Sequence, residues 1–356
     1  MNQESYRKLI SGQRTDYAAA ILRLFLTIAS QIYTVIISLR NFLYSKRWLK
    51  VHTVGVPAIS IGNITVGGTG KTPLVIWLYN LLHEKNYACA ILTRGYKTKK
   101  DKLFDEPAIL NEGCSKAKVI INPDRVAGGA KAVNDFDAKV LIMDDGFQHR
   151  RLHRHLDIVA IDATCPFGYG KILPAGLLRE PVVSLKRADA AVLTRCDQVD
   201  ETELTELEDK LLRINPDMLI AKSIHKPTCA KSISGEEINL EKLKDKRIFA
   251  FCGIGNPDAF FSTIKGLGAN LIDSRVYNDH HQYTDNCLAD IYEQAQRLNA
   301  DLILTTQKDW TKIASLAFVK NDTPFAYLAI ELKFMTAEDK LRRLIEDAIE
   351  GKITQK

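Results

Sequence analysis

The feature that most constrains the fold is a glycine-rich segment between a short apolar run and an apolar helical pattern. The apolar run covers 57–61, the helical pattern covers 73–82, and the segment between them reads Gly62-Asn63-Ile64-Thr65-Val66-Gly67-Gly68-Thr69-Gly70-Lys71-Thr72. A strand, a turn of small residues and Gly-Lys-Thr at the start of a helix are typical of a phosphate-binding loop, because backbone N–H groups and the helix dipole then face phosphate oxygens. The sequence therefore predicts that residues 65–72 bind the phosphates of a nucleotide.

Individual side chains of this loop have expected roles. Lys71 should reach the β and γ phosphates, and the Thr72 hydroxyl should sit on Mg²⁺. The strict phosphate-loop pattern has glycine where this chain has Thr65. Nucleotide binding is still expected, because the other glycines and Lys71-Thr72 stand in the required context between a strand and a helix.

A second apolar run ends in two carboxylates. Residues 139–143 are followed by Asp144 and Asp145, an arrangement similar to the element that holds magnesium at the carboxyl end of a strand in phosphate-loop proteins. Further strand-like runs cover 88–93, 156–161 and 190–194 and alternate with helical or loop segments. This alternation predicts an α/β fold with a largely parallel sheet, whose ligands collect at the carboxyl ends of the strands. Asp144 and Asp145 are therefore candidate magnesium ligands.

The amino-terminal region contains a long apolar stretch. Arg23 is its only charge between 18 and 39, and basic residues follow at Arg40, Lys46, Arg47 and Lys50. About 20 such residues could cross a bilayer, but polar residues recur every three or four positions and form one stripe on the helix. The pattern favours a helix that lies at an anionic membrane surface. Packing of the same helix into a protein core remains the alternative.

The length of 356 residues indicates about two domains, at roughly 100–200 residues each. A second α/β pattern begins near Arg247, with a predicted strand at 248–252, a strand at 269–276, a helix at 287–298 and a strand at 301–305. The predicted division is an amino-terminal tail and membrane helix at 1–50, a nucleotide-binding domain at 51–225, a connection at 226–246 and a smaller α/β domain at 247–356.

Composition excludes several classes of protein. With 46% hydrophobic and 26% charged residues, the chain is neither disordered nor a multi-span membrane protein. Its seven cysteines include no C-x-x-C pair and are expected to be reduced thiols. The net charge of +6 is too small to indicate nucleic acid as a partner, but it is compatible with a phosphorylated substrate or an anionic lipid surface.

An ordered set of motifs along most of the chain resembles the tetraacyldisaccharide 4'-kinase family. After the phosphate loop and Pro73, the set comprises Thr93-Arg94-Gly95-Tyr96, Asp105-Glu106-Pro107, Asp124-Arg125, Asp144-Asp145-Gly146-Phe147-Gln148-His149, Leu173-Pro174-Ala175-Gly176 and Asp279-His280. By this resemblance, the chain is a lipid kinase of lipid A biosynthesis. It would transfer the γ-phosphate of ATP to the 4'-hydroxyl of an acylated glucosamine disaccharide 1-phosphate, forming lipid IV(A) at the cytoplasmic face of a bacterial inner membrane.

The resemblance also implies site residues. It places Lys71 and Thr72 in the phosphate loop, Asp144, Asp145 and Gln148 near magnesium, and the pair Asp105 and His280 near the acceptor hydroxyl. It further implies a membrane-engaged amino-terminal helix and a smaller carboxyl-terminal domain, with a cleft that closes between the domains.

Two other functions remain open from the residues. A membrane-recruited phosphate-loop ATPase switch would use the same loop and helix, although Val66 stands where partitioning ATPases carry a lysine. A GTPase is suggested by Thr194-Arg195-Cys196-Asp197, which loosely matches the guanine-reading [NT]-K-x-D pattern except for Arg195.

Overall fold

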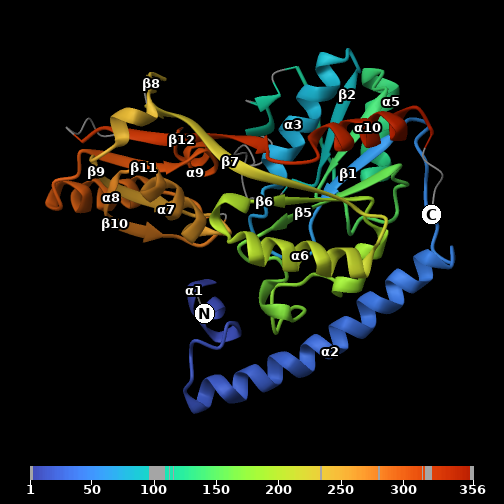
Figure 1. Cartoon of the computed structure of the whole chain (residues 1–356), viewed down its shortest axis with the longest axis horizontal. Coiled ribbons are helices and arrows are strands. Elements are labelled where there is room, and N and C mark those ends of the chain that lie inside the picture. Colours follow the sequence, from blue (N-terminus) through green and yellow to red (C-terminus); the bar gives the residue numbers. More distant parts are fainter. Residues whose placement is uncertain are drawn as a thin grey trace. The chain divides into compact units, whose positions relative to one another are not determined.

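The computed structural model describes residues 3–95, 109–111, 113–114, 116–232, 235–279, 281–314, 316 and 323–352. The chain divides into two compact units (Figure 1). Unit 1 comprises Met1–Ile224 together with Phe334–Lys356, and unit 2 comprises His225–Lys333.

The core of unit 1 is a parallel sheet. Its strands are β1 (Ala58–Gly62), β2 (Cys89–Thr93), β3 (Lys118–Ile121), β4 (Val140–Asp144), β5 (Leu156–Asp162), β6 (Ala190–Thr194) and the first part of β7 (Leu219–Ser232). They are ordered β7-β6-β5-β1-β4-β2-β3. Ile59 of β1 pairs in parallel with Ile142 of β4 on one side and Leu156 of β5 on the other. Because β1 and β4 are parallel neighbours, the phosphate loop and Asp144 follow strands that end at the same edge.

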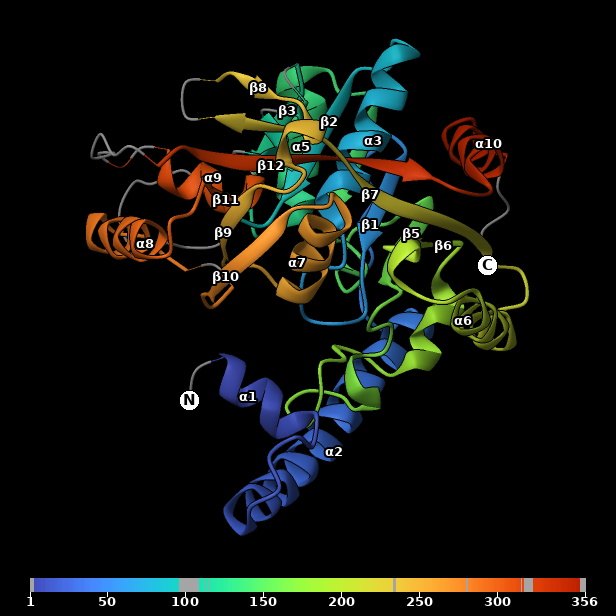
Figure 2. The same cartoon turned by 60° about the vertical axis from the view of Figure 1, so that its left-hand side comes forward.

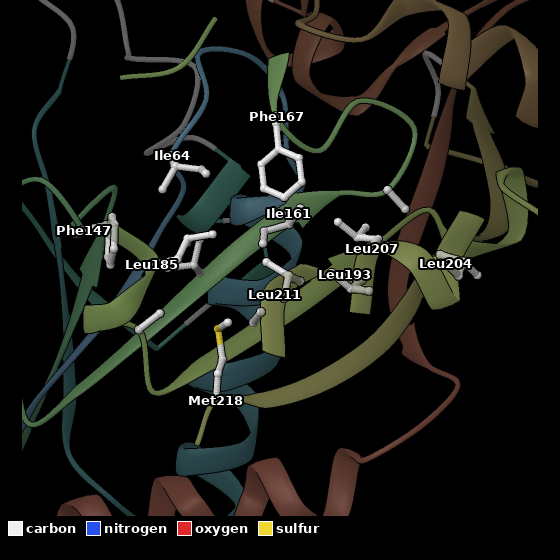
Figure 3. Close-up of a cluster of buried hydrophobic side chains, with 14 of the residues drawn as sticks. Ile64, Phe147, Ile161, Phe167, Leu185, Leu193, Leu204, Leu207, Leu211 and Met218 are labelled. Atoms are coloured by element: carbon white, nitrogen blue, oxygen red, sulfur yellow. The ribbon is translucent and has the colours of Figure 1, made fainter. Parts of the chain in front are cut away.

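Helices cover both faces of this sheet. Since parallel crossovers are right-handed, the strand order places α3 (Lys71–Glu84) on one face and α5 (Arg125–Phe136) and α6 (Glu201–Ile214) on the other. Figure 3 shows the core under α6, where Leu204, Leu207 and Leu211 pack with Ile161 and Leu193 of the sheet. The carboxyl-terminal helix α10 (Glu338–Ile349) also belongs to unit 1. Its Glu338 accepts a hydrogen bond from Trp77 of α3 at 3.2 Å.

Two amino-terminal helices, α1 (Gln3–Ile10) and α2 (Tyr17–Ser45), precede the sheet. The long α2 lies along the outside of unit 1 in both views (Figures 1 and 2). Its polar Ser30 is buried and donates a hydrogen bond to the carbonyl of Ile172 at 2.8 Å. In contrast, large apolar residues of α2 are exposed, among them Leu24, Phe25, Ile28, Ile32, Val35, Ile36, Leu39 and Phe42. Within the described residues, the apolar face of α2 is therefore not packed into a protein core.

Unit 2 is a second α/β layer structure. Its strands are β8 (Glu237–Ile238), β9 (Arg247–Cys252), β10 (Asn270–Val276), β11 (Leu302–Thr306), most of β12 (Phe325–Phe334) and the last part of β7. The order is β10-β9-β11-β12-β7, and β8 pairs with β7. Alternate residues of β9 point to opposite faces. Ile248 and Ala250 pack with α7 (Pro257–Gly266), whereas Phe249 and Phe251 pack with α8 (Asp285–Arg297) and α9 (Gln307–Ile313).

The α/β fold with a largely parallel nucleotide-binding sheet agrees with the sequence prediction, and the strand positions agree within about two residues. The domain limits differ from those predicted. The segment 226–246 is not a free connection, because it contains the second half of β7, all of β8 and a short 3₁₀ helix whose Leu243 is buried in the unit 2 core. The residues after 333 return to unit 1, where α10 packs on α3.

Candidate active site

The phosphate loop joins β1 to α3, and its backbone depends on glycine at two turns. Gly67 and Gly70 have φ angles of +131° and +83°, a region that side chains with a Cβ rarely adopt. Gly70 directly precedes α3, whose first residue is Lys71. This arrangement leaves N–H groups of the first helical turn unpaired within the helix, which makes the start of α3 suitable for binding an anion.

Buried side chains from neighbouring segments hold the loop in shape. The Asn63 amide donates to the Thr65 carbonyl at 2.7 Å and to the Thr69 hydroxyl at 3.1 Å. Thr194, at the end of β6, donates to the Thr69 carbonyl at 3.0 Å. Arg195 donates to the Gly68 carbonyl at 2.9 Å and forms an ion pair with Asp162 at 2.6 Å. Three of these bonds occupy the carbonyls of Thr65, Gly68 and Thr69 and so fix the backbone of the loop. The N–H groups of Val66 and Thr69 bond to the carbonyls of Leu177 and Gly67.

Asp145 connects the phosphate loop to the end of β4. One of its carboxylate oxygens lies 3.4 Å from Lys71 Nζ. Arg179 donates from one guanidinium nitrogen to both oxygens of Asp145, at 2.9 and 2.8 Å. Burial opposes ionisation of Asp145, but the positive charges of Lys71 and Arg179 outweigh it and hold the pKa of the carboxyl well below its usual range. Asp145 is therefore a carboxylate throughout the neutral range.

Asp144 is the last residue of β4 and is buried. Its side chain accepts a hydrogen bond from the Thr93 hydroxyl at 3.2 Å, and its carbonyl accepts one from Arg125 at 3.1 Å. Thr93 ends β2, the strand next to β4. Thr93 thus holds the buried carboxylate at the carboxyl edge of the sheet, and Arg125 holds the backbone that carries it.

The side-chain oxygen of Gln148 is a possible ligand for a divalent cation beside Asp144 and Asp145. Its side-chain amide donates to the Asn63 carbonyl at 2.8 Å, and its side-chain oxygen is buried without a hydrogen-bond partner among the described residues. Carboxylate and amide oxygens suit Mg²⁺. The described part of the chain contains no group of three or more His, Cys, Asp or Glu side chains that could hold a metal alone. Asp144, Asp145 and Gln148 therefore fit a cation that shares its remaining ligands with nucleotide phosphates and the Thr72 hydroxyl.

The predicted pair Asp105 and His280 lies outside the described residues. The residue before His280 is described: Asp279 forms an ion pair with Lys308 at 2.9 Å in unit 2. Residues 65–72, Asp144, Asp145 and Gln148 all belong to unit 1, and the contacts above link Lys71 to Asp145 and Gln148 to the start of the loop.

Sequence reasoning missed several residues at this site. Arg179 stands in Leu177-Leu178-Arg179-Glu180, directly after the Leu173-Pro174-Ala175-Gly176 motif, but nothing local to it indicates a carboxylate partner. Arg195 belongs to the segment that loosely matches a guanine-reading pattern, whereas the structure places its guanidinium on the phosphate loop. Asn63 directly follows β1 at the start of the glycine-rich segment, where an amide that shapes the loop is a recognisable signal.

The chain is similar to known proteins over most of its length. The family model for tetraacyldisaccharide-1-P 4'-kinase matches residues 22–350. The tetraacyldisaccharide 4'-kinase of Halothermothrix orenii is 32% identical over 370 residues, covering 94% of this chain and 96% of the relative. That of Syntrophus aciditrophicus is 36% identical over 349 residues, covering 90% and 91%. The crystal structure of LpxK from Aquifex aeolicus in complex with ATP superposes with a TM-score of 0.70 at 32% identity, covering 92% of this chain and 99% of that one. The chain therefore belongs to the tetraacyldisaccharide-1-P 4'-kinase family.

Proposed function

We propose that this protein transfers the γ-phosphoryl group of ATP to the 4'-hydroxyl of a tetraacylated glucosamine disaccharide 1-phosphate, forming lipid IV(A). The observation that carries the proposal is a phosphate loop, with Lys71 beside Asp145, in the same unit as a long helix with an exposed apolar face. Such a unit can bring together a nucleotide from water and an acceptor from a bilayer. Family membership supplies the identity of the acceptor.

The phosphate loop would bind ATP through its N–H groups, with Lys71 facing the β and γ phosphates. Phosphoryl transfer depends mainly on positioning and on neutralising the charge of the phosphates. Asp144, Asp145, Gln148 and the Thr72 hydroxyl would hold Mg²⁺, which when bound neutralises charge on the β and γ phosphate oxygens. Arg179 keeps Asp145 oriented and ionised through its two hydrogen bonds.

The acceptor hydroxyl must lose a proton as its oxygen bonds to the γ phosphorus and ADP departs. We assign this proton to Asp105, oriented by His280, because an imidazole can orient and charge-balance a carboxylate base. The assignment rests on the family resemblance of the motifs around these two residues.

Helix α2 would dock on the membrane. Among the described residues it is the one helix long and apolar enough to cross a bilayer, judged by length and composition. Its large apolar residues are exposed, while Ser30 is buried against the protein and donates to the Ile172 carbonyl. Exposed Lys46, Arg47 and Lys50 follow its end, and each basic residue near an anionic surface contributes about 1 kcal/mol. We infer peripheral or monotopic binding at the cytoplasmic face of the inner membrane, where ATP is available.

The test is incubation of the protein with γ-labelled ATP, Mg²⁺ and a tetraacyldisaccharide 1-phosphate in mixed micelles. Label in the lipid, absent when the acceptor carries a blocked 4'-hydroxyl, supports the proposal. Release of label as free phosphate at the same rate with and without lipid would instead indicate the ATPase switch. Nucleic acid is not expected to bind or to change the rate.

A further inference from the structure

The membrane-facing helix α2 is fastened to the nucleotide-binding unit by polar contacts near its carboxyl end. Arg40 donates to the carbonyl of Gln148 at 2.8 Å. Asn41 donates to the side chain of Glu180 at 2.7 Å, and its carbonyl accepts from Arg150 at 2.8 Å. These contacts join two successive residues of α2 to two segments that carry active-site side chains.

Two routes, meaning chains of contacts, lead from α2 to the active site, and the first passes through Gln148. The backbone of this residue is held by Arg40, and its side chain is bonded to Asn63 at the start of the phosphate loop. Gln148 also closely follows Asp145 in the chain. The backbone between them is packed tightly on β1, because a Cβ placed on Gly62 would lie 2.7 Å from the backbone nitrogen of Phe147. A shift of Arg40 would therefore move both the loop entrance and the segment after Asp145.

The second route runs through Glu180. This carboxylate is fully buried and accepts hydrogen bonds from Asn41 and from Arg187, the latter at 3.0 Å. Its neighbour in the chain is Arg179, which binds both oxygens of Asp145. The backbone N–H of Arg179 also donates to the Ile64 carbonyl of the phosphate loop at 2.7 Å. A buried carboxylate needs polar partners to stay charged and fixed, so Asn41 helps to hold the segment that orients Asp145.

The aromatic ring of Tyr44 on α2 adds contacts between the carboxyl end of this helix and the segment after Asp145. The guanidinium carbons of Arg40 and Arg150 each lie 5.4 Å from the ring centroid of Tyr44, one helical turn after Arg40. Arg150 also donates to the Ser45 hydroxyl at 3.2 Å. The carboxyl end of α2 and the segment after Asp145 are thus bonded in both directions, by Arg40 toward Gln148 and by Arg150 toward α2.

We propose that Arg40 and Asn41 are positioning residues for phosphoryl transfer, so that the helix that docks on lipid is also part of the scaffold of the Asp145 site. This inference rests on the proposed function. Both routes from α2 end at Asp145 or the phosphate loop, although they pass through different segments. The carboxyl end of the helix therefore acts on catalysis directly, in addition to any role of the apolar face in membrane binding.

The test compares Arg40→Ala, Arg40→Lys and Asn41→Ala with Arg23→Ala in the full-length protein. Arg23 lies on the same helix, but it donates to the Arg14 carbonyl within the amino-terminal segment. Measurements are kcat and KM for ATP with saturating lipid in mixed micelles, and sedimentation with vesicles that mix phosphatidylserine with phosphatidylcholine. Phosphatidylserine gives these vesicles a negative surface potential.

Arg40→Ala and Asn41→Ala should lower kcat by about 10- to 100-fold, as expected for a small misplacement of catalytic groups, with vesicle binding equal to that of the unchanged protein. Arg40→Lys retains a charged donor and should recover part of the loss, and Arg23→Ala should keep the original kcat. If Asn41 acts through Glu180, then Asn41→Ala combined with Glu180→Gln should lose little more than Glu180→Gln alone.

Three outcomes would overturn the inference. One is an unchanged kcat in both alanine variants, a second is a loss of kcat that matches a loss of vesicle binding, and a third is an equal loss in Arg23→Ala. If Arg40→Ala does not fold, Arg40→Lys and Asn41→Ala decide by the same criteria. Failure of the unchanged protein to phosphorylate the lipid would instead refute the proposed function, so the two failures are distinguishable.

Discussion

The Nζ atom of Lys71 lies 3.4 Å from a carboxylate oxygen of Asp145, so the lysine of the phosphate loop and the second acidic residue after β4 form one charged pair. Arg179 adds a second cation to the same carboxylate. The three side chains come from three separate segments of unit 1, and their arrangement determines what each substitution in the site should do.

Replacement of Lys71 by methionine should abolish most activity while leaving the fold intact. Asp145 keeps its hydrogen bonds to Arg179, so this half-buried carboxylate retains a charged partner. We expect kcat/KM for ATP to fall about 10²- to 10³-fold, the usual cost of losing one charge that stabilises the transferring group. Lys85→Met is the matched control, because Lys85 directly follows α3 and pairs on the surface with Glu346. Unchanged turnover in folded Lys71→Met would refute the phosphate-loop assignment.

Asp144→Asn and Asp145→Asn should both raise the Mg²⁺ concentration needed for half-maximal activity, because Mg²⁺ is usually held by one or two carboxylates plus phosphates. Asp145→Asn should also weaken the orientation of Lys71 and Arg179, since both lose their negative partner. The measurement is a magnesium titration of activity at saturating ATP. If neither variant changes the magnesium dependence, the cation is bound elsewhere.

Arg195→Ala should raise KM for ATP more than it lowers kcat. Arg195 holds the Gly68 carbonyl, and its loss would let the loop turn away from the geometry that presents N–H groups to phosphate. The substitution also leaves buried Asp162 without this partner, so Arg195→Ala combined with Asp162→Ala should recover stability but not ATP affinity. Nucleotide binding measured by calorimetry separates the two effects. Equal ATP affinity in the double variant and the unchanged protein would show that the loop keeps its shape without the hydrogen bond from Arg195 to the Gly68 carbonyl.

Local patterns in the sequence sufficed to predict the phosphate loop and the strands β1, β2, β4, β5, β6, β9, β10 and β11, because glycine spacing and continuous apolar runs involve only neighbouring residues. The prediction did not include β3, β7, β8 and β12. The contacts of Arg179 and Arg195 could not be predicted in the same way, because their partners Asp145 and Gly68 are distant in sequence and depend on strand order. The compact unit 2, His225–Lys333, differs from the predicted second domain at 247–356 for another reason. Pro227 and the Ser-Gly-Glu-Glu turn at 234–237 are local signals of a connection, although β7 continues through Pro227 to Ser232.

Gly62→Ala should destabilise the protein and lower its activity. A Cβ at this position would lie 2.5 Å from the Cβ of Phe147 and 2.7 Å from its backbone nitrogen. Relief requires a movement of the backbone after Asp145, and such overpacking costs about 1–3 kcal/mol. Gly266→Ala is the control, because an added Cβ at this helical position meets nothing within 4 Å. Thermal unfolding should show a lower Tm for Gly62→Ala only. If Gly62→Ala has the same Tm as the unchanged protein, the backbone around Phe147 can move to accept the added Cβ without loss of stability.

His149, next to Gln148, should make stability depend on pH. Burial and then the charges of Arg125 and Arg154 lower the pKa of His149 to about 4, whereas an unfolded histidine has a pKa of about 6.5. As the pH falls, the unfolded state therefore binds a proton at His149 before the folded state does.

The contribution of neutral His149 to the free energy of unfolding is complete above about pH 6.5 and is lost as the pH falls toward 4, with a slope of at most about 1.4 kcal/mol per pH unit. His149→Gln, which cannot take up this proton, should remove that part of the slope. Urea unfolding at about 25 °C, repeated between pH 7.5 and 4.5, gives the free energy of unfolding of each protein at each pH. Burial also lowers the pKa of His155 and His281, so both proteins should retain some slope. Parallel curves for the two proteins would mean that His149 takes up its proton equally in the folded and unfolded states.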